Sequence, residues 1–245
     1  MQTVTAVAHR GDPYRFRENT LDSLRSALRR GADAVEIDVR LTRDGVPVLL
    51  HDATLKRLWA HDRPLNALSA DEVRGLTAGG VPTLAEALAA TEGGRVMIDL
   101  PGDPSERAVA RIVAVARECG ATDRVYYTGA APAMLAVRAA DTAAEIALTR
   151  TTLAPARPAL LAAIRPRYLN YRFTLLDHAL TEHVHRTGHL VSCWTPDTRR
   201  SLRRLLDMNV DSITTNRVDL LDALRTDAPL QGRGPVSGTP GPGLR

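Results

Sequence analysis

The sequence predicts an α/β protein folded as a (β/α)8 barrel, with a small hairpin extension after the second strand. Apolar strand-like runs alternate with amphipathic helical segments along the whole chain. Eight such runs in 245 residues match the usual length of this barrel. A doubly wound sheet is the alternative, but no glycine-rich GxGxxG follows the first run, which argues against a dinucleotide-binding form of that sheet.

The predicted strands are short runs rich in valine, isoleucine and tyrosine, and each is followed by a helix or a connecting segment. The eight strand candidates are residues 4–9, 33–39, 95–100, 124–129, 145–149, 167–171, 189–194 and 211–215. The helical candidates are residues 18–30, 81–90, 105–118, 130–140, 158–164, 177–188, 198–209 and 218–225.

Three segments depart from this alternation. The dipeptide Asp44-Gly45 lies between VRLT and VPVLLHD and predicts a hairpin at the mouth of the second strand. Residues 54–80 are expected to form a polar connector. Residues 226–245 are rich in proline and glycine without periodicity, so we expect a disordered tail after a single domain of residues 1–225.

The composition is that of a soluble globular protein, with 44% hydrophobic residues. No apolar run approaches the roughly 20 residues that span a bilayer, and the N-terminus lacks the features of a secretory signal. We therefore expect a cytoplasmic protein without a stable membrane anchor. Cys119 and Cys193 show neither pairing nor metal spacing, so both are expected to be reduced packing residues.

The net charge of +4 gives little support to nucleic-acid binding. Lys56 is the only lysine, and the arginines are scattered among alanine-rich helices instead of forming a run. Aromatic residues make up only 4% of the chain, too few for stacking surfaces. We expect no nucleic-acid partner, and the sequence sets no oligomeric state.

Two carboxylates stand two residues apart on the second predicted strand. Glu36 and Asp38 point to the same face because successive strand side chains alternate. Asp99 ends the third strand, and barrel sites form where the strands end, so three carboxylates are expected to meet at a hard cation such as Mg²⁺ or Ca²⁺. The alternatives are an ion pair of the first two with a barrel arginine such as Arg40, and a capping or loop role for Asp99.

Other polar residues also follow strand ends. His9 ends the first strand and His51 ends the hairpin, and such an imidazole pair can take one proton and give another near neutral pH. Glu18 and Asn19, with Thr20, are expected to cap and orient the first helix, although Glu18 could instead bond a catalytic group. Trp194 either packs at the barrel mouth or forms a substrate wall.

The motif set resembles the glycerophosphodiester phosphodiesterase family of metal-dependent TIM barrels. The resemblance rests on HRG, six residues, ENT, then GADAVEIDVRLTRDGVPVLLHDATLKR, and continues through VPTLAEAL, WTPD and NVDSITTNRVD. It covers nearly all of residues 4–224, and HRG, ExD and HD in this order are highly specific. The roles that it implies are acid and base for His9 and His51, metal ligands for Glu36, Asp38 and Asp99, and phosphate contact for Arg10. Trp194 is a further candidate substrate contact, and the candidate supporting residues are Glu18, Asn19 and Asp52.

The resemblance implies hydrolysis of a small-molecule phosphodiester with Mg²⁺ or Ca²⁺, Mn²⁺ being a third candidate. The expected substrate is a glycerophosphodiester, cleaved to sn-glycerol 3-phosphate and an alcohol in lipid and glycerol metabolism. Which histidine is the base, and whether water or a substrate hydroxyl attacks, stay open. The alternative is a weakened or inactive barrel that binds a phosphodiester or polyanion.

The chain departs from the family pattern at two places. The family usually has Glu and then Lys two residues on, where this chain has Asp99 and Pro101. It usually has Pro before ENT, where this chain has Arg17. Because the missing lysine would face the substrate, we expect the substrate preference to differ more than the reaction type.

Overall fold

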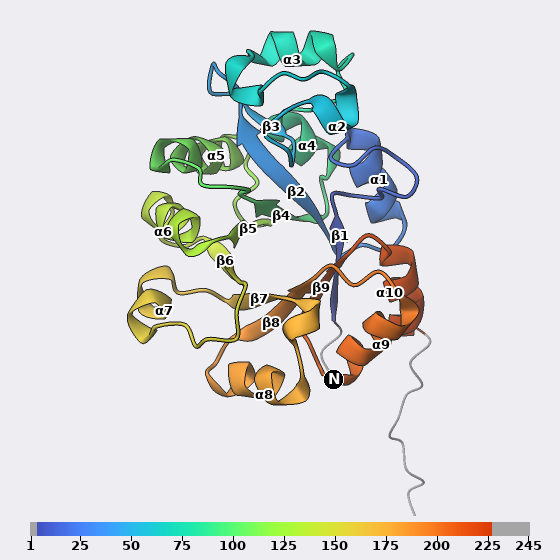
Figure 1. Ribbon diagram of the computed structural model, residues 1–245, viewed down its shortest axis with the longest axis vertical. Coiled ribbons are helices and arrows are strands. Elements are labelled where there is room, and N and C mark those ends of the chain that lie inside the picture. Colours follow the sequence, from blue (N-terminus) through green and yellow to red (C-terminus); the bar gives the residue numbers. More distant parts are fainter. Residues whose placement is uncertain (1–3, 227–245) are drawn as a thin grey trace, which may run out of the picture.

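The computed structural model describes residues 4–226 (Figure 1). Within that range, eight parallel strands close into a barrel, because β1 pairs with both β2 and β9 and the others pair in order between them. The barrel strands are β1 (Thr5–His9), β2 (Ala34–Leu41), β4 (Arg95–Asp99), β5 (Val125–Gly129), β6 (Glu145–Arg150), β7 (Tyr168–Arg172), β8 (Leu190–Trp194) and β9 (Ser212–Thr215). The predicted (β/α)8 barrel is thus confirmed, and the doubly wound alternative is wrong.

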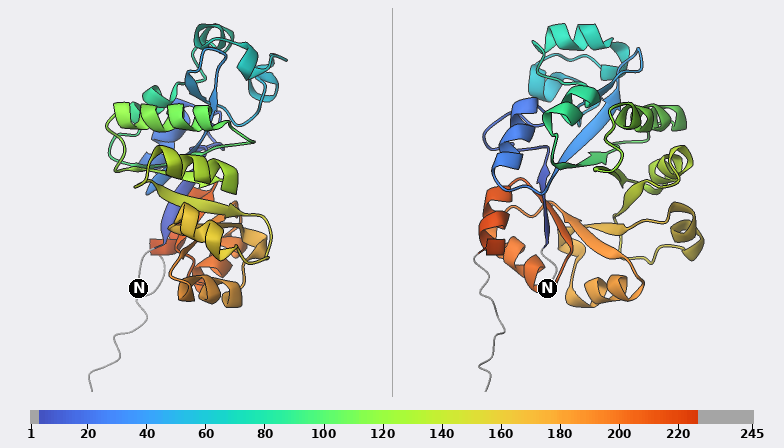
Figure 2. Two further views of the ribbon diagram at one scale, coloured as in Figure 1. Left: turned by 90° about the vertical axis from the view of Figure 1, so that its left-hand side faces the viewer. Right: turned by 180° about the vertical axis from the view of Figure 1, so that it is seen from behind.

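Helices lie around the outside of the barrel (Figures 1 and 2). They are α1 (Leu21–Arg29), α4 (Leu84–Ala90), α5 (Glu106–Glu118), α6 (Ala131–Ala140), α7 (Pro158–Ile164), α8 (His178–Arg186), α9 (Arg199–Asp207) and α10 (Val218–Thr226), with a 3₁₀ turn, η2 (Phe173–Leu175), before α8. Several begin at a residue whose side chain accepts a backbone N–H of the first turn, among them Thr83 before α4 and Ser105 before α5. All eight helical segments predicted from the sequence are present.

The main core lies between the strands and the helices. On β2, Val35 and Ile37 are fully buried in this layer, as the alternation of strand side chains predicts. A smaller apolar cluster of Val7, Ala34, Met97 and Tyr126 comes from the strands alone. Apolar side chains therefore lie on both faces of these strands. The polar residues described below stand nearer the carboxyl ends of the strands.

The hairpin extension predicted after the second strand is confirmed. β3 (Pro47–Leu49) pairs antiparallel with β2, so that Val39 lies opposite Leu49. Gly45 adopts a φ of +79°, a conformation that glycine reaches without a steric penalty, and its N–H donates to the Thr42 carbonyl. The hairpin directs the chain back toward the barrel mouth, where His51 follows.

The expectation of a polar connector at residues 54–80 is wrong. This segment forms α2 (Lys56–Trp59), a 3₁₀ turn η1 (Leu65–Ala67) and α3 (Ala70–Leu76) (Figure 1). Its scattered leucines lack helical periodicity, but they bury a second small core together with the hairpin. That core consists of Val48, Leu50, Leu55, Leu65, Leu68, Val73 and Val81.

Other expectations concern the C-terminus, the cysteines and membranes. Thr226, where we expected the tail to begin, ends α10, and residues 227–245 lie outside the described residues. Both cysteines are free; Cys193 is buried, but Cys119 is exposed, so a packing role is wrong for Cys119. Among the helices of residues 4–226, none has the length and apolar character to cross a membrane.

Candidate active site at the carboxyl ends of the strands

The strand register brings the three predicted acidic ligands together. His9 of β1 lies opposite Glu36 of β2, and Asp38 lies opposite Asp99 of β4. One carboxylate oxygen from each of Glu36, Asp38 and Asp99 lies within 4.8 Å of the others, the one such group of possible metal ligands that residues 4–226 provide. Asp99 therefore belongs to the acidic cluster, and its alternative role as a capping or loop acid is wrong.

Burial and mutual repulsion make this cluster electrostatically unfavourable on its own. The exposed fraction is 4% for Glu36 and 1% for Asp38. Burial, followed by the charges of Asp38 and Asp99, holds the pKa of Glu36 well above its ordinary value. Burial and the charge of Asp38 raise the pKa of Asp99 to about 7. Oxygen donors with an excess of negative charge fit a hard divalent cation.

Arg10 lies against the acidic cluster and has a constrained backbone. Its φ is +55°, and its N–H donates to Glu36 Oε2 at 2.9 Å. Its Nε lies 3.0 Å from Asp38 Oδ2, and its Nη1 donates to Glu18 Oε1 at 2.9 Å. The following Gly11 has no room for a side chain, since a Cβ there would lie 2.3 Å from Ser23 Oγ. This lack of space explains why the third residue of the HRG sequence is glycine.

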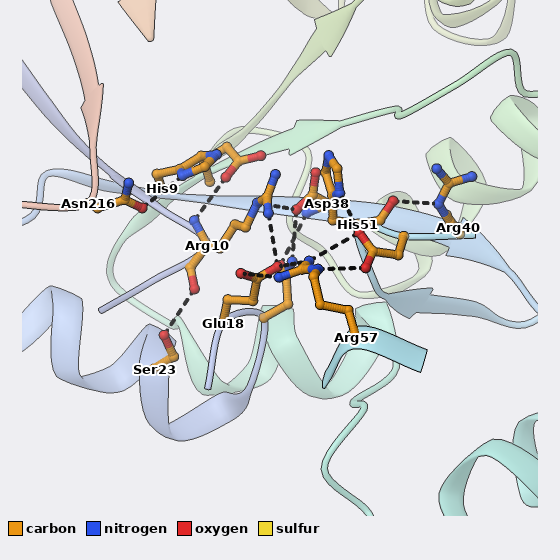
Figure 3. Close-up of polar contacts among 12 residues, drawn as sticks. His9, Arg10, Glu18, Ser23, Asp38, Arg40, His51, Arg57 and Asn216 are labelled. Atoms are coloured by element: carbon orange, nitrogen blue, oxygen red, sulfur yellow. Dashed lines mark hydrogen bonds and ion pairs between the residues drawn. The ribbon is translucent and has the colours of Figure 1, made fainter. Parts of the chain in front are cut away.

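The ion pair on Asp38 comes from Arg10, and the alternative pairing with Arg40 is wrong. Arg40 Nε donates to the carbonyl of His51 at 2.9 Å, and none of the salt bridges within residues 4–226 includes Arg40. Figure 3 shows Arg10 and Arg40 reaching this region from different elements.

Glu18 and Asn19 bind site residues, so the expectation that they cap α1 is wrong. Asn19 Nδ2 donates to Asp38 Oδ2 at 2.8 Å, and Asp38 N donates back to Asn19 Oδ1 at 3.2 Å. Glu18 accepts hydrogen bonds from Arg10 and Arg57. Only Thr20 has the expected capping role, accepting from Ser23 N.

His9 is held by an amide whose orientation is fixed in turn. Its Nδ1 lies 2.9 Å from Asn216 Oδ1, while Asn216 Nδ2 donates to Asp197 Oδ2 at 2.7 Å. Because the carboxylate can only accept, the amide oxygen faces His9 and Nδ1 carries the proton. Burial and then the charge of Arg10 lower the pKa of His9. The ring is therefore kept neutral, with Nε2 as its acceptor nitrogen.

His51 has a different partner, an ionised carboxylate. Its Nδ1 lies 2.8 Å from Asp52 Oδ1, and Arg57 Nε donates to Asp52 Oδ2 at 2.6 Å. Hydrogen bonds from Arg57 are the main cause that lowers the pKa of Asp52 to about 2. Arg57 also donates to Glu18, so it joins the two acids beside Arg10 and His51 (Figure 3).

The structure adds three residues that the sequence reasoning gave no role, Asn216, Asp197 and Arg57. Asn216 and Asp197 stand in the WTPD and NVDSITTNRVD segments, and Arg57 ends the LHDATLKR run. Their motif positions were the available signal, but two of the partners lie far along the chain, since Asn216 binds His9 at a separation of 207 residues and Arg57 binds Glu18 at a separation of 39. Trp194 ends β8 half-buried, and its Nε1 has no hydrogen-bond partner in the part of the chain that the structure describes.

The acidic cluster leads to a stability prediction for Asp99→Asn in EDTA. The carboxyl ionises near pH 4 when unfolded and near pH 7 when folded, so the folded state binds the proton more tightly. The native protein should therefore lose stability between about pH 4 and pH 7 and stay at that level above it. The variant has no carboxyl to ionise at position 99, so its free energy of unfolding should exceed the native value at pH 8. The expected difference is a few kcal/mol, because each unit of pKa difference between the folded and unfolded states corresponds to about 1.4 kcal/mol.

Urea unfolding across this pH range measures the difference. The matched control is Asp62→Asn, which removes an exposed carboxylate whose one ion-pair partner among residues 4–226 is Lys56. A gain for Asp99→Asn that did not shrink toward pH 4 would contradict the assignment of repulsion to this cluster.

Comparison with known protein sequences identifies the family of the chain. The sequence model of the glycerophosphoryl diester phosphodiesterase family matches residues 9–220. A Mycobacterium tuberculosis protein named "Probable glycerophosphodiester phosphodiesterase 2" is 30% identical over 241 residues, which cover 88% of each chain.

Solved structures share the fold. A glycerophosphodiester phosphodiesterase from Thermotoga maritima has a TM-score of 0.79 and 21% identity, covering 91% of this chain and 99% of that one. A phosphodiesterase from Oleispira antarctica, in complex with the product sn-glycerol-3-phosphate, has a TM-score of 0.81 and 21% identity over 91% and 97% of the two chains. Since the family model spans most of the chain and the M. tuberculosis relative aligns over nearly its full length, the chain belongs to the glycerophosphoryl diester phosphodiesterase family and is an enzyme.

Proposed function

We propose that the protein hydrolyses a glycerophosphodiester to sn-glycerol 3-phosphate and an alcohol, with Mg²⁺ or Ca²⁺ as the cofactor and Mn²⁺ as a third candidate. The observation that carries this proposal is the convergence of Glu36, Asp38 and Asp99 beside His9. The family membership supports the substrate class, and the product in the O. antarctica structure is glycerol 3-phosphate. We propose glycerol and lipid metabolism as the setting of this reaction, and the cytoplasm as its compartment.

The donor set fits a divalent cation on chemical grounds. Glu36, Asp38 and Asp99 offer carboxylate oxygens, while the protein compensates their charge only in part through Arg10. When bound, a divalent cation would supply Lewis-acid stabilisation of the charge on the phosphoryl oxygens. Asn19 orients Asp38, and the Arg10 N–H orients Glu36, so the acids are positioned by hydrogen bonds.

We assign the base to His9 and the acid to His51. His9 is neutral, and Asn216 fixes the tautomer that leaves Nε2 able to accept a proton from the nucleophile. His51 lies against ionised Asp52, which can compensate the charge of a protonated His51 ring. The ring then gives its proton to the leaving oxygen. Arg10 is the proposed phosphate contact, and Trp194 the proposed wall for the substrate.

Turnover of glycerophosphocholine tests this function against the alternative of an inactive barrel that binds a phosphodiester or polyanion. We expect release of glycerol 3-phosphate with Mg²⁺, Ca²⁺ or Mn²⁺, and its loss in EDTA. Glycerophosphoethanolamine and glycerophosphoinositol extend the panel to other alcohols. If the folded protein hydrolysed none of them with any of the three cations, the binding alternative would be correct.

Asn216→Ala tests how His9 is held. Without the amide, the His9 ring can rotate and exchange its tautomers, so kcat should fall on the order of 100-fold, the scale of a misplaced catalytic group. The measurement is kcat against pH, because an altered tautomer balance should also change the shape of the profile. Asn209→Ala, which changes an exposed asparagine after α9, is the control. A normal rate in Asn216→Ala would remove Asn216 from the mechanism.

A further inference from the structure

Arg40 is a half-buried arginine on the strand that carries the acidic cluster. It follows Glu36 and Asp38 at the same spacing of two, so its side chain leaves β2 on the face of those acids. Its Nε is held by the carbonyl of His51 at 2.9 Å. One end of the guanidinium is therefore fixed by the main chain next to a proposed catalytic residue (Figure 3).

The other end of this guanidinium lies over the loop that follows β4. A Cβ built on Gly102 would lie 3.7 Å from Arg40 Nη1 and 3.9 Å from Nη2. The loop thus presents bare backbone to the guanidinium, and its preceding residue, Pro101, supplies no charge. Arg40 thus places a cation between the end of β2 and this loop.

The two terminal nitrogens of Arg40 carry no hydrogen bond or ion pair to any residue from 4 to 226. Arg10 differs, because Asp38 and Glu18 already engage its Nε and Nη1. A guanidinium stays charged at any ordinary pH, and its paired N–H groups match two oxygens of a phosphate. A fork that is fixed at Nε and open at Nη1 and Nη2 is organised in advance for an anion.

We propose that Arg40 binds the phosphate of the substrate and of the product, with Nη1 and Nη2 donating to non-bridging oxygens. This inference rests on the proposed function, and it gives the site a second phosphate-binding arginine beside Arg10. It also changes the expectation drawn from Pro101, because the substrate phosphate then meets a cation that comes from β2.

Arg40→Gln separates this role from the support of His51. The glutamine amide nitrogen stands where arginine has Nε, so it can still donate to the His51 carbonyl, while the charged fork is removed. We expect its Kd for sn-glycerol 3-phosphate, by calorimetry with Ca²⁺ present, and its KM for glycerophosphocholine each to rise about 10-fold to 100-fold, the scale of a charge-assisted hydrogen bond. The affinity for Ca²⁺ alone should stay near the native value, and kcat should change much less than KM.

Two further variants complete the test. Arg40→Lys keeps the charge without the fork and should restore part of the product affinity. Arg43→Gln removes an exposed arginine of the same hairpin, paired with Glu72, and should change neither constant.

The outcomes separate the inference from the proposed function. A native enzyme that hydrolyses the diester, with unchanged Kd and KM in folded Arg40→Gln, would overturn the role of Arg40 alone. A fall confined to kcat would do the same, because it would show support of His51 instead of phosphate binding. A native protein with neither turnover nor affinity for glycerol 3-phosphate would overturn the proposed function and this inference together.

Discussion

Replacing His51 by alanine is expected to lower kcat for glycerophosphocholine by about 100-fold to 10,000-fold, the usual scale for a lost general acid or base. The choline alkoxide is a poor leaving group that needs a proton. The p-nitrophenyl diester of glycerol 3-phosphate releases p-nitrophenolate, which leaves without being protonated. His51→Ala should therefore lose much less activity on this substrate. His9→Ala should lose kcat to a similar degree on both substrates, because the nucleophile needs a base in either reaction. Single-turnover rates on the two diesters measure this contrast.

The double variant provides a second test of the same assignment. If His9 and His51 act as a unit, their joint removal should be little worse than the greater single loss. His183→Ala, at an exposed position on α8, is the matched control for a histidine replacement. Equal losses for His51→Ala on both diesters would refute its role as the acid, and multiplied losses in the double variant would indicate that one histidine only binds substrate.

Replacing Glu36 by glutamine should abolish activity while the fold remains intact. The neutral amide keeps the shape of the side chain, but it removes a charge from the cation ligands and leaves two carboxylates in the cluster. In EDTA the variant should be more stable than the native protein, because the repulsion and burial that raise the pKa of Glu36 are relieved. Calorimetric titration with Mg²⁺ or Ca²⁺ should show greatly weakened binding.

Glu92→Gln serves as its control, since this exposed acid stands in the turn before β4 and outside the cluster. Native-like turnover by Glu36→Gln at a low concentration of cation would contradict the assignment of a metal site. A variant that loses both activity and its cooperative unfolding transition would instead show that Glu36 is required for the fold.

The barrel and the acidic cluster could be predicted because both depend on local patterns. The spacing of Glu36 and Asp38 fixes a common face, and Asp99 ends a run whose length and composition identify a strand. The meeting of strand ends at one end of a barrel then brings these acids together. Predicting the acidic cluster therefore needs only these local patterns and the fold class.

The hydrogen-bond partners could not be predicted in this way. Asn216 stands 207 residues from His9, and Glu18 and Arg57 stand 39 apart, so no local period links them. The ENT motif before α1 also fits two roles, because Glu18 and Asn19 suit a helix start as well as they suit the site. The φ of +57° at Asn19 turns its amide toward Asp38, and this conformation has no sequence signal beyond the tolerance of asparagine for it.

The second core could not be predicted, because the leucines of residues 54–80 follow no helical or strand period. Leu55, Leu65 and Leu68 become a core only when the hairpin brings Val48 and Leu50 to them. Such a core depends on contacts between segments, which periodicity within one segment does not report.

The short helix α2 connects this second core to the catalytic residues. Arg57 of α2 binds Glu18, and the ring of Trp59 lies 4.2 Å from the guanidinium of Arg17, so α2 fastens the β1–α1 loop at two adjacent points. Local opening of the 54–80 segment would release both points, together with the partner of Asp52. Fluctuation of this segment would thus set the fraction of molecules in which His51 and Arg10 are correctly positioned. A change such as Leu65→Ala, at a position that does not touch the substrate, would then alter the rate by lowering that fraction.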